Sequence, residues 1–111
     1  MTLEATFSAL ADPTRRGVID LLRTQPRRAG DLADELGMSR PAMSRHLKVL
    51  RTSGLIEPAN DEADLRAKVY RLRHEEFSAM RTWLDEVERF WSGQLASFVA
   101  HANRTRGKRA P

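Results

Sequence analysis

The amino-acid sequence predicts a mainly helical α+β fold, in which a helix-turn-helix is followed by a two-stranded β-hairpin and long terminal helices form a dimer. Three observations support this prediction. Amphipathic helical segments, bounded by capping or turn residues, fill the first 54 residues. Two short alternating segments then flank a polar loop. A long segment without proline, from residue 75 to about residue 100, repeats apolar side chains at helical spacing.

The first two helices are indicated by apolar periodicity and by a capping pair. Leu3, Phe7 and Leu10 recur at positions i, i+4 and i+7, which is the pattern of a short helix with one apolar face. Asp12 is a favourable N-cap, and Pro13 suits the first helical position because its missing N–H is not needed there. A second helix therefore begins at this pair.

A third, shorter helix and a fourth helix form the predicted helix-turn-helix. The third helix ends at Gly37, a residue type that readily adopts the left-handed conformation found after helices. Ser39 is a strong N-cap for the fourth helix, Pro41 lies in its first turn, and Gly54 follows its end. The turn between the two helices is therefore tight.

The fourth helix, residues 39–53, has one apolar face and one basic face. At about 100° per residue, Met43, Leu47 and Leu50 fall on one side of this helix. The opposite side holds Arg40, Ser44, Arg45, Lys48 and Arg51, and no acidic residue. An ordinary amphipathic surface helix is the alternative, but such a helix usually pairs opposite charges at spacing i, i+4.

The charge of the chain is concentrated in two places. The 111 residues suit a single domain and carry a net charge of +4. Residues 39–56 hold +4 and residues 103–111 another +4, so the rest of the chain carries −4. This distribution indicates a polyanionic partner, although a charge run is often only a solvated face. We predict a domain over residues 1–102 and a disordered basic tail over residues 103–111.

Short polar and basic side chains in the first turns of the fourth helix fit the major groove of double-stranded DNA, which admits one α-helix. Arg40 and Arg45 can each donate two hydrogen bonds to a guanine. Lys48 and Arg51 lie further along, where phosphates pass. His46 lies on the apolar side and is predicted to pack or to face a phosphate. The predicted DNA-binding residues are Arg27, Arg28, Ser39, Arg40, Pro41, Ser44, Arg45, His46, Lys48, Arg51, Arg66 and Lys68.

The two alternating segments, residues 55–57 and 68–72, predict a β-hairpin with a long tip. A hairpin directly after a helix-turn-helix is the arrangement of a winged helix. The tip, residues 60–64, is acidic and would be repelled by phosphates. Arg66 and Lys68 are therefore the expected wing contacts, and whether the tip touches DNA stays open.

The last predicted helix carries an apolar seam. Phe77, Leu84, Trp91 and Phe98 recur every seven residues, as in helices that pack against another helix. A helix of this length overhangs a domain of this size, so a second copy of the chain is the simplest cover. Burial within the monomer is the alternative. The predicted dimer-interface residues are Leu3, Phe7, Leu10, Trp83, Val87, Phe90, Trp91, Leu95 and Phe98.

Several classes of protein are disfavoured by what the sequence lacks. The chain has no cysteine, which excludes disulfides, thiolate metal sites and a cysteine nucleophile. Neither a membrane span nor a secretory signal is recognisable, so a cytoplasmic protein is expected. Ser44 and His46 are two residues apart on a helix and face different ways, and no phosphate-binding glycine loop occurs. The sequence therefore predicts no enzyme and no cofactor.

Four segments of the chain carry a resemblance to a known family: ALADPTRRGVIDLL, DLADELGMS, SRHLKVLRTSGLIE and KVYRL. They resemble the ArsR/SmtB (arsenic-repressor) family of winged helix-turn-helix transcriptional regulators, and the likeness extends over about residues 3–100. The resemblance implies a bacterial homodimeric repressor that binds an imperfect palindrome. It also implies that the fourth helix enters successive major grooves and that the hairpin lies beside the minor groove or backbone.

The resemblance does not extend to metal sensing. Family members that bind metal at the third helix use a Cys-x-Cys pair, where this chain has the segment DLADE. The Asp-x-His and His-x-x-Glu/His spacing of the family's second metal site is also absent from the last helix. We therefore predict no metal site. An unidentified small-molecule inducer remains a possible partner, and activation is an alternative to repression.

Two other functions fit the same basic helix. The first is a protein-interaction module whose winged helix has lost DNA binding. The second is a chromosomal protein that binds DNA without regard to sequence. Salt dependence does not separate either from a repressor, because phosphate contacts make any DNA binder salt-sensitive. Comparing a specific with a random duplex does.

Overall fold

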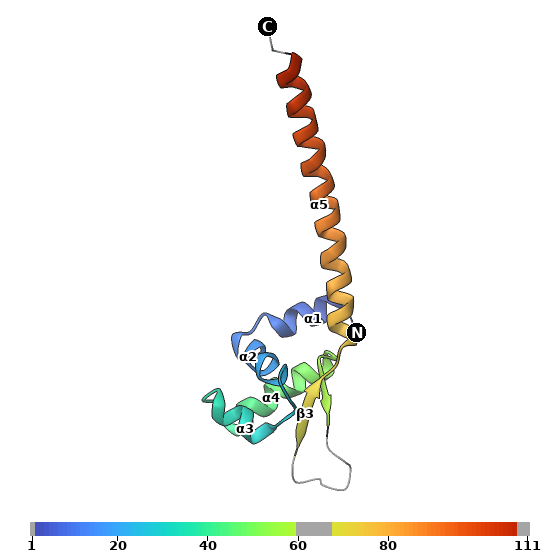
Figure 1. The fold of residues 1–111 in the computed structure, drawn as a ribbon. Helices are drawn as coiled ribbons and strands as arrows, with labels where there is room; N and C mark the ends of the chain where they lie inside the picture. The colour runs from blue at the N-terminus through green and yellow to red at the C-terminus, as the bar shows by residue number, and fades with distance from the viewer. Residues whose placement is uncertain (1, 60–67, 109–111) are drawn as a thin grey trace. The chain divides into compact units, whose positions relative to one another are not determined.

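The computed structural model of the chain describes residues 2–59 and 68–108, with side chains up to residue 105. The chain divides into two compact units, Met1–Met80 and Arg81–Pro111. The elements are α1 (Leu3–Leu10), α2 (Pro13–Leu22), β1 (Arg27–Arg28), α3 (Ala29–Glu35), α4 (Arg40–Thr52), β2 (Ile56–Pro58), β3 (Val69–Leu72) and α5 (Glu75–Lys108) (Figure 1). The mainly helical fold with a helix-turn-helix and a β-hairpin is thus confirmed.

The predicted caps start the two helices that position the site. The Asp12 side chain accepts a hydrogen bond from the backbone N–H of Arg15 at 3.1 Å, at the start of α2. The Ser39 hydroxyl accepts one from the N–H of Ala42 at 3.2 Å, at the start of α4. Each bond satisfies a backbone donor that has no partner within its helix. Pro41 lies in the first turn of α4, as predicted.

Two glycines end the helices of the helix-turn-helix. Gly37 follows α3 with φ of 63°, and Gly54 follows α4 with φ of 78°. Side chains with a Cβ atom rarely adopt this left-handed conformation, so these two positions favour glycine. The predicted helix ends are confirmed at both places.

The small sheet has three strands where the sequence predicted two. Its order is β1-β3-β2, and both pairs are antiparallel. Strand β1 pairs with the far edge of β3, placing Arg27 opposite Tyr70 and Arg28 opposite Val69. A strand of two residues carries no alternation that a sequence pattern can reveal. Only its partner strand, forty residues later, defines it.

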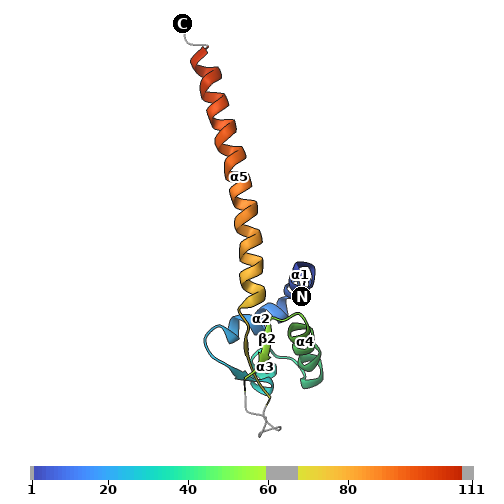
Figure 2. The ribbon, with the colours of Figure 1, turned by 90° about the vertical axis from the view of Figure 1, so that its right-hand side faces the viewer.

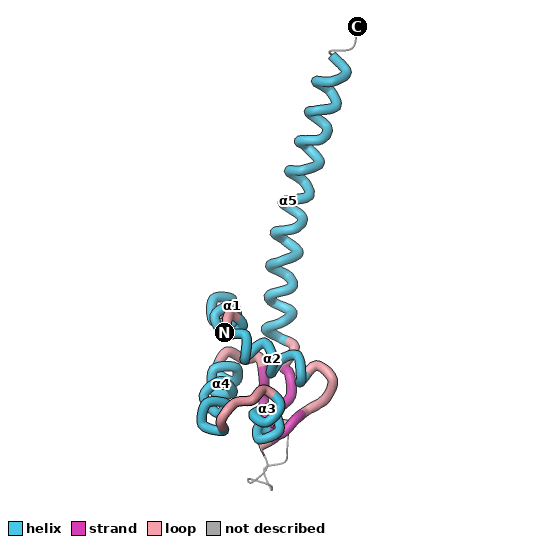
Figure 3. Tube along the Cα trace, turned by 90° about the vertical axis from the view of Figure 1, so that its left-hand side faces the viewer, coloured by secondary structure: helices cyan, strands magenta, loops and turns pink. Residues whose placement is uncertain are grey.

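The core of the first unit lies between the small sheet and the helices around it. Helix α2 contacts β3, α3 contacts β1 and α4 contacts β2 (Figure 2), and the strands form one group beside α2 and α3 (Figure 3). The buried apolar residues are Ala9, Val18, Ile19, Leu22, Leu32, Ala33, Met43, Leu47, Leu50, Leu55, Ile56 and Tyr70. Those from α2, α3 and α4 lie on the predicted apolar faces, so burial orients these helices. For α1 the prediction was wrong: Thr6 and Ala9 are its buried residues, whereas Leu3 and Leu10 are half-buried and Phe7 is exposed.

Helix α5 is longer than the sequence predicted. It continues to Lys108 and has 34 residues, about 51 Å at 1.5 Å per residue. Residues 103–108 are therefore helical, although they were expected to belong to a disordered tail. The segment NRTRGK contains no proline, so nothing in it blocks the backbone hydrogen bonds of a helix. Residues 109–111 of the predicted tail lie outside the described residues.

Replacing Ser39 with Ala is expected to lower the free energy of unfolding by about 1 kcal/mol, because α4 loses its side-chain cap. Urea denaturation at a fixed protein concentration measures this change. Ser44→Ala is the matched control on the exposed face of the same helix, and its effect should stay within about 0.5 kcal/mol. Equal stabilities for the two variants would contradict the cap.

Candidate nucleic-acid interface

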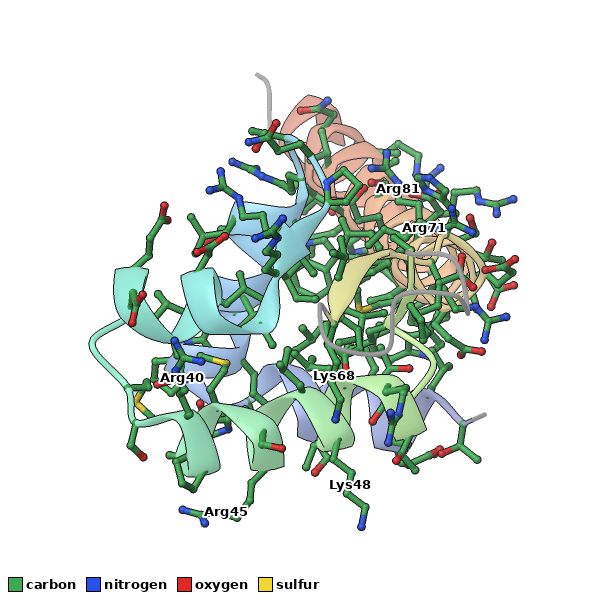
Figure 4. All side chains as sticks on the ribbon, turned by 90° about the horizontal axis from the view of Figure 1, so that it is seen from below. Arg40, Arg45, Lys48, Lys68, Arg71 and Arg81 are labelled. Carbon is green, nitrogen blue, oxygen red and sulfur yellow. The ribbon has the colours of Figure 1, made fainter. Side chains whose placement is uncertain are left out.

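Helix α4 has the two faces that the sequence predicted. Met43, Leu47 and Leu50 are buried in the core of the first unit. The exposed side chains are Arg40, Pro41, Ser44, Arg45, Lys48, Val49, Arg51 and Thr52. Figure 4 shows Arg45 and Lys48 pointing away from the surrounding helices and strands. These two cations and the exposed Ser44 hydroxyl form a surface that a ligand can reach.

Arg40 lies apart from this outward row. Its side chain turns toward α3 (Figure 4), and a Cβ atom built on Gly30 would lie only 3.4 Å from Nη2 of Arg40. Its guanidinium thus occupies the junction of α3 and α4. The sequence prediction grouped Arg40 with Arg45 as equivalent base-contacting residues, and the structure separates them. Angles on a single helix do not show where the neighbouring helix lies.

Arg27 differs more clearly from its predicted position. Its Nε donates to the carbonyl oxygen of Leu21 at 3.0 Å and its Nη2 to Oγ1 of Thr24 at 3.3 Å. Its Nη1 forms an ion pair with Oε1 of Glu35 at 3.2 Å. The guanidinium therefore ties α2 to α3 within the chain, and its charge is opposed there. Arg28, the next residue, is exposed.

His46 is half-buried behind the exposed face of α4, as its place on the apolar side predicted. Its Nδ1 lies 3.4 Å from Nη1 of Arg15. An arginine can only donate, so Nδ1 accepts in this contact and the proton of a neutral ring is on Nε2. Arg15 also donates from Nε to the carbonyl oxygen of Ala9 at 2.6 Å and from Nη2 to that of Ser8 at 3.2 Å. Arg15, which no sequence pattern singled out, therefore joins α1 and α2 to α4.

The pKa of Asp12 is lowered from its ordinary value of 3.8, mainly by the hydrogen bond from the backbone N–H of Arg15. The positive charges of His46, when protonated, and Arg15 act in the same direction. The fold therefore favours the carboxylate. Its stabilising contribution is present above pH 3.8 and is lost as the pH falls through the lowered folded-state pKa.

We expect the Asp12 carboxyl carbon to titrate below pH 3.8 in an NMR titration of the folded protein. The same titration in concentrated urea should give the ordinary value, because unfolding removes the backbone hydrogen bond. Identical midpoints in the two conditions would show that the bond does not favour the carboxylate.

The described part of the hairpin adds one free cation. Lys68 is exposed immediately before β3. Further along, Arg71 pairs with Oε1 of Glu57 at 2.9 Å and Arg73 with Oε2 of Glu57 at 3.6 Å, so these two charges are opposed within the sheet region. Arg66 and the acidic tip at residues 60–64 lie outside the described residues.

The predicted interface residues of the second unit form an apolar stripe on one helix. Among the described residues of this unit, the helix has no second element to pack against. Phe90, Trp91 and Phe98 are 69%, 67% and 69% exposed. Trp83, Val87 and Leu95 are also exposed. In the first unit, Leu3 and Leu10 are half-buried and Phe7 is exposed at 38%. Leu10 packs partly against the core.

The described residues contain neither a cluster of metal ligands nor a helix suited to span a membrane. Across residues 2–59 and 68–108, no three His, Cys, Asp or Glu side chains are grouped so that they could hold a metal ion. In the same residues, no helix combines the length and the apolar character needed to cross a membrane.

Comparison with known proteins places these features in a family. The model of the family "Bacterial regulatory protein, arsR family" matches residues 12–57, which contain α2, α3 and α4. The HTH-type transcriptional regulator Rv2034 of Mycobacterium tuberculosis is 40% identical over 98 residues, covering 86% of this chain and 84% of that protein. The transcriptional repressor SdpR of Bacillus subtilis is 42% identical over 50 residues, covering 45% of this chain and 56% of that protein.

Solved structures agree with the sequence comparisons. An ArsR-like transcriptional regulator from Rhodococcus sp. RHA1 superposes with a TM-score of 0.78 at 29% identity, covering 92% of this chain and 91% of that one. These relatives are transcriptional regulators and not enzymes. With its capped helix-turn-helix, its winged-helix fold and its exposed basic face on α4, the chain belongs to the ArsR family of helix-turn-helix transcriptional regulators.

Proposed function

We propose that this protein is a homodimeric repressor that binds a palindromic operator in double-stranded DNA through α4. The observation that supports this most directly is the exposed face of α4, which carries basic and hydroxyl side chains and no carboxylate. Helix α4 begins with a capped first turn, and the first turns of a recognition helix are the part that contacts base edges. A helix of this kind suits the major groove, where hydrogen-bond donors distinguish guanine.

The residues of this surface have different proposed roles. Arg45 reads a guanine, since its side chain points outward from the second turn of α4 (Figure 4). Lys48 and Arg51 contact phosphates further along the groove, and Ser44 contacts either a base or a phosphate. Ser39, Pro41 and His46 belong to the same helix but act mainly by starting it and by packing it.

The flanking cations are proposed to contact the DNA backbone. Arg28 lies on β1 and Lys68 lies immediately before β3, the strand that pairs with β1, and both are exposed. Arg66 is proposed as a further contact from the hairpin. Arg27 is not part of this set, because its guanidinium is engaged by Leu21, Thr24 and Glu35.

The homodimer is proposed from the apolar stripe of α5. Trp83, Val87, Trp91, Leu95 and Phe98 recur at helical spacing on one side of this helix and are exposed in the single chain. Burying large aromatic side chains away from water is strongly favourable, so we expect the α5 helix of a second copy to pack against this stripe. Two-fold symmetry also presents two recognition helices, which matches a palindromic site.

Repression is proposed because a chain of this size can block a promoter by occupying it, and the relative SdpR is itself a transcriptional repressor. The protein is proposed to act in the cytoplasm, without cofactor and without metal sensing through cysteines, which the chain lacks. Residues 103–108 extend α5 with further basic side chains, and we propose that they add attraction to DNA of any sequence.

Selection of bound fragments from genomic DNA, followed by titration of the selected duplex and a scrambled one, tests this function. A repressor should prefer its own site by about 10³-fold or more at physiological salt. Equal binding of both duplexes would identify a sequence-indifferent DNA-binding protein instead. Binding of neither would favour a protein-interaction module.

A further inference from the structure

The first unit contains a cavity of about 410 Å³ where α3, α4 and the sheet meet. Its wall includes the start of α3, the inner edge of α4 and the beginning of β3. The backbone N–H of Ala29 donates to the carbonyl oxygen of Lys68 at 2.9 Å, which holds the start of α3 against β3 on one side of this space. A volume of this size is in the range of pockets that bind small molecules, about 300–1,000 Å³.

Three cations line this cavity. They are Arg28 from β1, Arg40 from α4 and Lys68 before β3. Within the part of the chain that the structure describes, none of the three side chains forms an ion pair, in contrast to Arg27, Arg71 and Arg73 nearby. Asp31 is the one carboxylate among the described lining residues, so the lining carries a net charge of +2. Converging unpaired cations favour an anionic ligand.

The rest of the wall is apolar. Met43, Leu47 and Tyr70 form the floor of the cavity, where 1%, 4% and 6% of their surfaces are exposed. Gly30 contributes no side chain, which leaves room for the Arg40 guanidinium at the rim. A simple phosphate ion would use the cations but not the apolar floor. The lining therefore fits a ligand that has both an anionic group and a compact apolar body.

We propose that this cavity binds a small organic anion, and that its occupancy weakens binding of DNA. The anionic group lies among Arg28, Arg40 and Lys68, and the apolar body contacts Met43 and Tyr70. Ser44 belongs both to the cavity wall and to the exposed face of α4, so a ligand there competes with a DNA strand for the same donors. The regulatory part of this inference rests on the proposed function.

Binding is tested by adding three probes to the ¹⁵N-labelled full-length protein and following its amide NMR signals. The probes are phenyl phosphate, inorganic phosphate and phenol. Phenyl phosphate should shift the signals of Gly30, Ser44 and Tyr70, and should bind about tenfold more tightly than inorganic phosphate because the ring leaves water. Phenol should bind weakly, because it offers no charge to the cations. Equal affinities for phenyl phosphate and inorganic phosphate would indicate that the cavity binds a phosphate group of DNA, and would overturn the proposal.

Matched variants locate the site. Lys68→Ala and Arg28→Ala should each weaken phenyl phosphate binding by about fivefold or more, since each removes one charge from the cavity. Arg45→Ala, which removes the same charge from the outward face of α4, should leave phenyl phosphate binding unchanged. Circular dichroism verifies that the variants are folded. Losses of the same size in all three would show that the probe responds only to net charge, against the proposal.

The link to DNA is tested with the selected duplex. Phenyl phosphate should raise the apparent Kd of the wild-type protein for that duplex, and should do so less for Lys68→Ala. A protein that binds the duplex but shows no phenyl phosphate shifts at the cavity overturns this inference and leaves the proposed function intact. A protein that shows those shifts but binds no duplex retains the ligand site and loses the proposed function. Binding of both without competition overturns the regulatory part.

Discussion

Replacing Trp91 with Asp is expected to convert the proposed dimer into monomers at micromolar concentration. Trp91 lies on the apolar stripe of α5 and is 67% exposed in the single chain, so a partner helix is its expected cover. A carboxylate at this position would be buried without a counter-charge when the dimer forms. Sedimentation velocity measures the change in mass. Affinity for a full palindrome should fall by about 10²–10⁴-fold, because the two halves no longer bind as one unit.

Gly93→Asp is the matched control for this variant. It introduces the same carboxylate on the same helix, about 200° around the axis from Trp91. A Cβ atom at Gly93 would have nothing within 4 Å, so the new side chain has room. This control should remain dimeric. Unchanged sedimentation of the Trp91 variant, or equal dissociation of both variants, would refute the α5 seam.

Replacing Arg45 with Ala is expected to weaken binding of the selected duplex by about 1–3 kcal/mol at each half-site, or roughly 5- to 150-fold. Arg45 points outward from α4 and has no ion-pair partner in the part of the chain that the structure describes (Figure 4). Its loss removes a paired hydrogen bond to one base. Preference at that base should therefore relax, which titration of duplexes substituted at single positions measures.

Comparing Lys48→Ala with Arg45→Ala distinguishes a phosphate contact from a base contact. Lys48 also points outward from α4, but as a single ammonium group it is proposed to contact the backbone. Its removal should weaken the selected and scrambled duplexes alike and reduce the salt dependence of binding. If Arg45→Ala behaves in the same way, without loss of preference at any base, the base-reading role assigned to Arg45 is wrong.

The elements that sequence patterns identified correctly are those controlled by nearby residues. Asp12 and Ser39 cap helices through hydrogen bonds to N–H groups three residues later. Gly37 and Gly54 allow the left-handed conformation at helix ends. Helical periodicity then separated the buried from the exposed face of α4. All of these depend on interactions within one or two helical turns, which a single sequence displays.

The features that sequence patterns missed depend on residues far apart in the chain. Strand β1 exists because Arg27 and Arg28 pair with β3, and the charge of Arg27 is opposed by Glu35. Likewise, His46 meets Arg15 across 31 positions of the chain. The end of α5 was misplaced for a different reason. Its last residues have neither a strong stop signal nor an apolar face, so composition favoured a disordered tail.

The amino-acid sequence by itself determined where the main helices begin, which side of α4 is basic and where α5 carries its apolar stripe, because these properties follow from local hydrogen bonds and from the helical repeat. Tertiary structure alone decided which cations remain unpaired. It placed Arg27 against Glu35 within the chain, left Arg45 facing outward, and brought Arg40 to a cavity beside Arg28 and Lys68. Ion pairs and cavities form between elements, and periodicity within one element contains no information about its neighbours.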